Sequence, residues 1–261
     1  MVARIITFGD SNTDRGYAGA GASIVALSYV SVDYERPAAS APNNSTQLAG
    51  KIESQWAQRY SPAIVAVNHA IGGTTSGSGR TQYGSPNALT PVNGITRFDA
   101  EVLGLGSPWN GGELANLVYS GPITRARSFT PTVNDFVYVS IGTNDQYYGV
   151  SAAQTVANIG TMIDKWVARG LPANHFIVTT LGPSPISTSM PAVNTGIRSL
   201  VAQKGIRMID LATYLSPDNG LTWHSQNLVV QDGTGAHYAE GVRSWLADQV
   251  ATIMGAVTAP R

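Results

Sequence analysis

Short apolar runs alternate along the chain with longer stretches in which apolar residues recur at helical spacing. The short runs are rich in β-branched residues and predict strands over residues 3–8, 62–67, 135–141, 175–181 and 206–209. The longer stretches predict helices over residues 46–60, 95–103, 151–169, 190–204 and 238–256. Because strands separated by helices favour a parallel sheet covered on both faces, we expect an α/β fold with three layers (α/β/α) and a central, mostly parallel sheet.

The chain has 261 residues, which is enough for one large α/β domain. We therefore expect a single domain over residues 1–261. Two stretches rich in Gly, Ser and other small or polar residues lack a clear period, and they predict long loop insertions near residues 16–45 and 76–132.

Charge and cysteine content exclude several classes of function. The 16 Lys and Arg residues balance the 16 Asp and Glu residues, so the basic excess typical of nucleic-acid-binding proteins and polybasic membrane anchors is absent. The sequence has no cysteine, which excludes disulfides, thiolate zinc sites and a cysteine nucleophile. We expect a neutral small-molecule or carbohydrate ester as the partner, with neither nucleic acid nor a membrane involved.

The sequence leaves the cellular compartment and the oligomeric state open. No apolar run approaches the length of a membrane helix, and the first residues are typical of a strand rather than of a secretory signal peptide. A secreted origin stays compatible with the sequence if a leader has been removed.

Polar clusters follow three of the predicted strands directly, at residues 9–14, 68–74 and 142–145. In an open α/β sheet, ligands bind outside the carboxyl ends of the strands, so these clusters predict a shared site. A fourth cluster, residues 232–237, lies just before the last predicted helix.

The residue types in these clusters suit nucleophilic catalysis. A serine hydroxyl such as that of Ser11 is a poor nucleophile until a base removes its proton. His237 can serve as that base because histidine titrates near neutrality, and a nearby carboxylate would fix its tautomer. The Ser11 and Gly73 backbone N–H groups and the Asn144 side-chain amide could stabilise the oxyanion that forms.

The four clusters resemble the sequence blocks of the GDSL-like, or SGNH, hydrolase superfamily. They read GDSNTD at 9–14, NHAIGGTTS at 68–76, GTND at 142–145 and DGTGAHYAEG at 232–241. The resemblance implies a flavodoxin-like SGNH hydrolase fold and a serine esterase that needs no cofactor. It also implies Ser11 as nucleophile, Gly73 and Asn144 with Ser11 in the oxyanion hole, and His237 as base.

The last block departs from the family pattern, Asp-x-x-His. Thr234 stands three residues before His237, and the nearest acid is Asp232, five residues before it. Either a two-residue insertion still lets Asp232 reach the imidazole, or another group such as a backbone carbonyl orients the ring. We predict Asp232 as the third catalytic residue. In the second block, Gly72 is the alternative to Gly73.

Each cluster taken alone has an ordinary structural interpretation. Gly-Asp-Ser-Asn and Gly-Thr-Asn-Asp are good turn and capping sequences. Asp10 and Asp14 could be metal ligands, but without a nearby histidine cluster they predict no metal site. For His175 and His224 we expect structural roles, and for His69 a structural role is at least as well supported as a place in the site.

We therefore predict a serine esterase that hydrolyses short-chain acyl esters through an acyl-enzyme on Ser11. Acetyl is the preferred acyl group and carbohydrate a candidate carrier, since Tyr147 and Tyr148 follow the third block and suit stacking on sugar rings. Two alternatives are a thioesterase or lysophospholipase of the same superfamily, and a non-catalytic carbohydrate-binding module on the same fold.

Overall fold

The computed structural model describes residues 4–14, 48–70, 74–77, 93–105, 130–230 and 235–258. Most of the predicted loop insertions near 16–45 and 76–132 lie outside these residues, as do the predicted site residues Gly73 and Asp232.

A five-stranded parallel sheet forms the centre of the molecule, as predicted. Its strands run in the spatial order β2-β1-β3-β4-β5. They are β1 (Arg4–Gly9), β2 (Val65–Asn68), β3 (Phe136–Ser140), β4 (Phe176–Thr179) and β5 (Arg207–Ile209). Because the chain first adds β2 on one side of β1 and then β3 on the other, the carboxyl end of β1 lies at the topological switch point where such sheets bind ligands.

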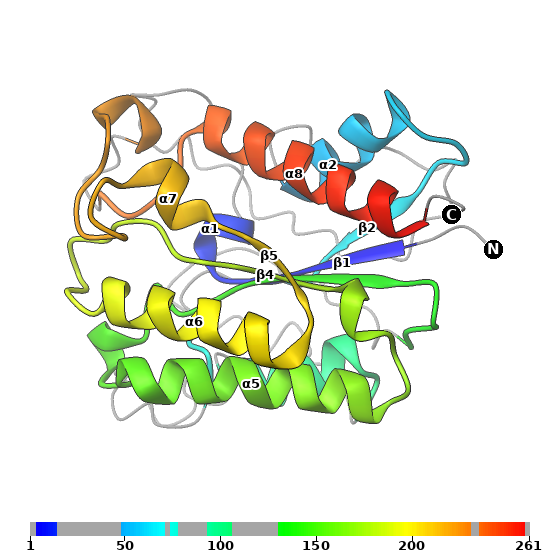
Figure 1. Cartoon of the computed structure of the whole chain (residues 1–261), viewed down its shortest axis with the longest axis horizontal. Coiled ribbons are helices and arrows are strands. Elements are labelled where there is room, and N and C mark those ends of the chain that lie inside the picture. Colours follow the sequence, from blue (N-terminus) through cyan, green and yellow to red (C-terminus); the bar gives the residue numbers. More distant parts are fainter. Residues whose placement is uncertain are drawn as a thin grey trace, which may run out of the picture.

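Helices cover both faces of this sheet, which gives the three layers that the sequence predicts (Figure 1). One layer contains α2 (Leu48–Ala57) and α8 (Glu240–Thr258), and the other contains α5 (Ala152–Ala168) and α6 (Met190–Lys204). Within the described residues, no helix has both the length and the apolar character that crossing a bilayer requires.

Alternation along the strands builds two separate apolar cores. In β1, Ile5 packs with the core under α2 and α8, whereas Ile6 and Phe8 belong to the core under α5 and α6. In β3, Tyr138 and Val139 divide between the two cores in the same way. Since successive side chains of a strand point to opposite faces, each strand supplies apolar residues to both layers.

Helix α5 begins and ends where the sequence predicts. The Ser151 side chain accepts a hydrogen bond from the backbone N–H of Gln154, which caps the first turn. The helix ends before Gly170, whose φ of 76° lies in the left-handed region that glycine adopts without strain.

The predicted helix at 95–103 consists of two joined elements, α3 (Gly94–Arg97) and the π-helical turn η3 (Phe98–Val102). Short helices that the sequence did not predict follow several strands or loops. They are α1 (Ser11–Asp14), η4 (Gln146–Tyr148), η5 (Ala173–His175), α7 (Leu211–Leu215) and η6 (Gln226–Leu228).

The turn from β1 into α1 depends on the absence of a side chain at Gly9. A Cβ atom there would lie 2.2 Å from the Ser140 carbonyl oxygen and 2.6 Å from Thr13 Oγ1. Both distances are far below van der Waals contact, so glycine allows β1, β3 and the start of α1 to approach one another directly at the site.

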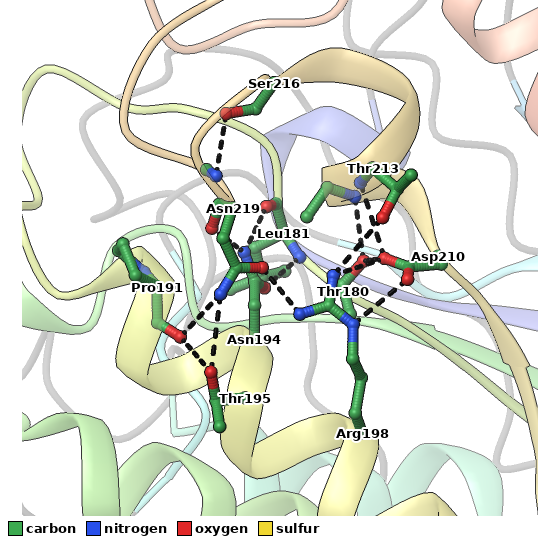
Figure 2. A network of polar contacts seen from close by, with 12 residues as sticks. Thr180, Leu181, Pro191, Asn194, Thr195, Arg198, Asp210, Thr213, Ser216 and Asn219 are labelled. Carbon is green, nitrogen blue, oxygen red and sulfur yellow. Dashed lines mark hydrogen bonds and ion pairs between the residues drawn. The ribbon is translucent and has the colours of Figure 1, made fainter.

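A polar network fixes the chain between α7 and the last cluster to helix α6 (Figure 2). Asn194 donates to the Asn219 carbonyl oxygen at 2.8 Å and binds both the N–H and the carbonyl of Leu181. Arg198 forms an ion pair with Asp210 at 2.7 Å and donates to Asn219 Oδ1 at 2.6 Å. These bonds hold Asn219, whose φ of 62° lies in the left-handed region, against helix α6.

Candidate active site

Ser11 and His237, which lie 226 positions apart in the sequence, are in direct contact. The His237 Nε2 atom is 2.9 Å from Ser11 Oγ, a normal hydrogen-bond distance. Ser11 is 6% exposed and His237 8%, so the contact is shielded from water while each residue keeps a small accessible surface. A serine hydroxyl in this arrangement can pass its proton to the imidazole.

Each partner of this contact is held by local backbone bonds. Ser11 is the first residue of α1, and the turn that contains it is closed by a bond from Thr13 N–H to the Asp10 carbonyl at 3.1 Å. The segment around His237 pairs with residues 228–230, through an antiparallel bridge between Val229 and Tyr238 and a 2.9 Å bond from Val230 N–H to the His237 carbonyl.

Asp10, directly before Ser11, is a buried carboxyl group with an altered pKa. Burial raises the pKa of Asp10 to about 7, and the nearby Asp145 carboxylate adds to the rise. Hydrogen bonds from Asn12 and Thr143 oppose this rise without cancelling it. Asp10 therefore changes its charge near neutral pH rather than in the acidic range usual for aspartate.

The Asn144 side chain lies beside the second block. It is partly exposed, and its Nδ2 atom donates to the Thr74 carbonyl at 3.1 Å. The loop that carries it turns at Gly142, whose φ of 124° favours glycine and where a Cβ atom would lie 2.8 Å from Thr155 Cγ2.

Asp145 joins the second block to the third, a role that the sequence analysis did not assign. Its carboxylate is buried and accepts hydrogen bonds from Ser76 N–H at 2.7 Å, from Ser76 Oγ, and from Thr155 Oγ1 at 2.6 Å. Asn158 completes the network by donating to Ser76 Oγ at 2.8 Å. This network fixes the position of Asn144 relative to Thr74 and Ser76.

A buried ion pair fixes the chain on both sides of residues 71–73. The guanidinium group of Arg97 binds the Glu101 carboxylate at 2.6 and 3.2 Å, with both side chains at most 1% exposed. The same group donates to the His69 carbonyl at 2.5 Å and to Thr74 Oγ1 at 2.9 Å. The sequence shows the four-residue spacing of this pair, but such pairs ordinarily lie on exposed helix surfaces.

Two other histidines, His69 and His175, have structural surroundings. His69 is buried, with Nδ1 3.6 Å from Glu101 Oε2. The His175 ring stacks on Phe136 with centroids 4.0 Å apart, and its Nδ1 binds the Asp135 carbonyl at 3.1 Å. His175 precedes β4, at the end of the sheet opposite to the strand ends that carry Ser11 and Asn144.

Comparison with known proteins identifies the family. The model of the GDSL-like lipase/acylhydrolase family matches residues 7–227. This chain belongs to that family. It is therefore a carboxylic ester hydrolase of the GDSL, or SGNH, type, which confirms the predicted family, fold and enzyme class. The matched region includes Ser11 and Asn144 and ends before the block that contains His237.

Solved structures with the same fold are distant in sequence. A lipase/acylhydrolase from Enterococcus faecalis is 16% identical with a TM-score of 0.58, covering 100% of this chain and 99% of the other. Est24, a carbohydrate acetylesterase from Sinorhizobium meliloti, is 14% identical with a TM-score of 0.55 and coverages of 98% and 99%. An aryl esterase from M. smegmatis is 15% identical with a TM-score of 0.55 and coverages of 97% and 100%.

No curated protein sequence matches the chain.

The raised pKa of Asp10 predicts how one substitution changes the pH dependence of stability. Because the folded protein keeps the Asp10 proton to higher pH than the unfolded chain, the stability it contributes is fully present below pH 3.8 and is lost as pH rises through about 7. Asp10→Asn cannot titrate. Its unfolding free energy relative to the wild type should therefore rise across this interval and level off above it, as measured by urea unfolding at a series of pH values.

Asp218→Asn provides the matched control. Hydrogen bonds from Ser216 and Thr222 lower the pKa of Asp218, so its contribution is lost only as pH falls below the ordinary range. The difference between this variant and the wild type should stay constant between pH 3.8 and about 7. A constant difference for Asp10→Asn as well would contradict the prediction.

Proposed function

We propose that this esterase hydrolyses short-chain acyl esters, acetyl esters first, through an acyl-enzyme on Ser11. The observation that supports this assignment is the 2.9 Å contact between Ser11 Oγ and His237 Nε2 at the switch point of the sheet. Nucleophile and base within hydrogen-bonding distance are the arrangement that covalent acyl transfer requires.

The proposed reaction proceeds in two steps. His237 takes the Ser11 proton as the hydroxyl oxygen attacks the ester carbonyl carbon, and it then gives that proton to the leaving alcohol as the ester C–O bond breaks. In the second step, His237 takes a proton from water while the water oxygen attacks the acyl-enzyme. The acid is released and the proton returns to Ser11 Oγ.

The charge that develops on the carbonyl oxygen needs hydrogen-bond donors already in place. We assign this role to the backbone N–H groups of Ser11 and Gly73 and to the side-chain amide of Asn144. Loss of one such donor typically raises the barrier by about 3–4 kcal/mol. The fixed positions of His69 and Thr74, on either side of Gly73, support this assignment.

The leaving group is proposed to be a carbohydrate. Tyr147 is 65% exposed and follows Asn144 closely, and its ring meets that of Tyr148 edge-on with centroids 4.9 Å apart. Gln146 anchors the same turn to the loop after β4, because its Oε1 accepts from Ser187 Oγ at 2.8 Å and from Ser189 N–H at 3.0 Å. An exposed aromatic ring on an anchored turn is suited to stacking on a sugar. The fold likeness to a carbohydrate acetylesterase agrees with this choice.

Ser11→Ala should abolish hydrolysis of 4-nitrophenyl acetate, because the variant has no hydroxyl to form the acyl-enzyme. We expect kcat to fall by at least about 10⁴-fold, with a thermal unfolding temperature close to that of the wild type. Mass spectrometry should detect an added acetyl group on the wild type after rapid acid quenching and none on the variant. Substantial remaining activity in Ser11→Ala would remove the nucleophile assignment and favour a different reaction on the same fold.

The third catalytic residue is tested by comparing Asp232→Ala with Thr234→Ala. If Asp232 fixes the imidazole tautomer, its loss should lower kcat by about 10²- to 10⁴-fold, whereas loss of Thr234 should have a much smaller effect. Both variants are assayed with the same activated ester at several pH values. A larger loss of kcat in Thr234→Ala would contradict the assignment of Asp232 as the third catalytic residue. Equal small losses of kcat in both variants would favour a serine–histidine dyad.

The substrate class is tested with acyl esters from acetyl to decanoyl, an acyl thioester, a lysophospholipid and an acetylated xylan oligosaccharide. We expect kcat/KM to be highest for acetyl, and Tyr147→Ala to raise KM for the acetylated sugar while changing 4-nitrophenyl acetate hydrolysis little. Val133→Ala, an exposed position 58% accessible just before β3, serves as the control. A preference for long acyl chains or thioesters would instead favour the thioesterase or lysophospholipase alternative.

A further inference from the structure

Asn12 binds the backbone on both sides of His237. Its Nδ2 atom donates to the Ala236 carbonyl at 3.1 Å, and its Oδ1 atom accepts from the Tyr238 N–H at 3.0 Å. One amide side chain thus pairs with the two residues that flank His237, in the way that a peptide group pairs across neighbouring strands.

The position of Asn12 in the turn after β1 means that this pairing joins the Ser11 turn to the His237 segment. It is the residue directly after Ser11, it is 2% exposed, and its own N–H donates to Asp10 Oδ1 at 3.0 Å. The turn that carries the nucleophile is therefore bonded to the segment that carries His237. These two bonds flank the 2.9 Å contact between Ser11 Oγ and His237 Nε2.

Two further bonds of the His237 segment join it to parts of the fold other than α1. The Val230 N–H bond to the His237 carbonyl links it to the preceding segment, and Tyr238 Oη accepts from Gly182 N–H at 3.1 Å beyond the end of β4. Both can persist while the segment shifts relative to α1. The Asn12 bonds cannot, because they join the two backbones whose separation sets the distance between Ser11 and His237.

We infer that Asn12 is a positioning residue for the serine–histidine pair, an inference that rests on the function proposed above. The family motif has leucine where this chain has Asn12, and a leucine side chain can neither donate nor accept a hydrogen bond. In this chain, Asn12 holds the His237 backbone at the distance from which its imidazole reaches Ser11.

Asn12→Leu is the most direct test, because leucine has the same branched skeleton but no hydrogen-bonding groups, and it leaves the Ala236 carbonyl and the Tyr238 N–H without this partner. A displacement of about 1 Å at a catalytic group can lower the rate about a hundredfold. We therefore expect kcat for 4-nitrophenyl acetate to fall about a hundredfold with little change in KM, because the substrate contacts are not altered.

A double-mutant cycle separates positioning from general damage to the fold. In the His237→Ala background there is no imidazole to position, so Asn12→Leu should lower the remaining kcat by less than about threefold. A purely structural defect would lower kcat by the same factor in both backgrounds.

Asn194→Leu is the matched control, because Asn194 is also buried and also binds backbone groups on both sides of its amide, those of Leu181 and Asn219. It should lower the unfolding temperature at least as much as Asn12→Leu does, with the same effect on kcat whether or not His237 is present. Asn12→Ala, which leaves space for water beside the two backbone groups, repeats the test if the leucine variant does not fold.

The possible results distinguish this inference from the proposed function. If His237→Ala retains wild-type activity, the proposed function fails. If His237→Ala is impaired and both Asn12 variants keep wild-type kcat, or lose it equally in both backgrounds, then only the positioning role fails. A large loss confined to the background with His237 supports the inference.

Discussion

The contact between Ser11 and His237 depends on the rest of the fold, because the two residues come from distant parts of the sequence. One follows the first strand and the other precedes the last helix, and their side chains must meet to within hydrogen-bonding distance. A parallel sheet meets this demand because all its strands end on one edge, with β1 at the switch point between β2 and β3. The short turns beyond that edge then set the final geometry.

Buried polar networks, rather than apolar packing alone, set those turns. The Arg97–Glu101 pair and the Asp145 carboxylate hold parts of the second block to α3 and to the third block. Desolvation makes buried charges costly. Removing one partner of a buried ion pair typically destabilises a protein by about 3–5 kcal/mol, because the other charge is left buried and unpaired. Multiple hydrogen bonds around each charged group offset that cost and restrict the backbone at the site to one arrangement. Stability and alignment of the site therefore depend on the same bonds.

The sequence is sufficient to predict the sheet and the long helices, because the strands are short apolar runs rich in β-branched residues and the helices repeat apolar residues at helical spacing. All five strands and the capped helix α5 appear where these patterns place them. The four-residue helix α1 and the five-residue helix α7 have too few residues for a period. Helix α7 is defined instead by an Asp210 side chain that accepts from Thr213 N–H. A π-helical turn such as η3 results from tertiary packing that a helical pattern does not specify.

Some residues of the candidate site can also be predicted from the sequence, whereas others are revealed only by the folded structure. Ser11, Asn144 and His237 were identified from motifs, and the structure places Ser11 and His237 in contact. The roles of Asn12, Arg97 and Asp145 could not be predicted, because each depends on which backbone groups lie opposite after folding. The pKa of Asp10 also depends on burial, which a turn sequence does not reveal. The catalytic roles of Ser11, Asn144 and His237 stay predictions, as do those of Gly73 and Asp232.

The order of strands and helices has a consequence for synthesis of the protein on the ribosome. In the part of the chain that the structure describes, β5 is the last strand and ends at Ile209, so all five strands of the sheet have been made before His237 is added. Helix α8 begins at Glu240 and supplies much of the apolar layer on one face of the sheet (Figure 1). Since His237 lies just before α8, both its contact with Ser11 and the apolar layer that α8 supplies can form only after β5 has been synthesised.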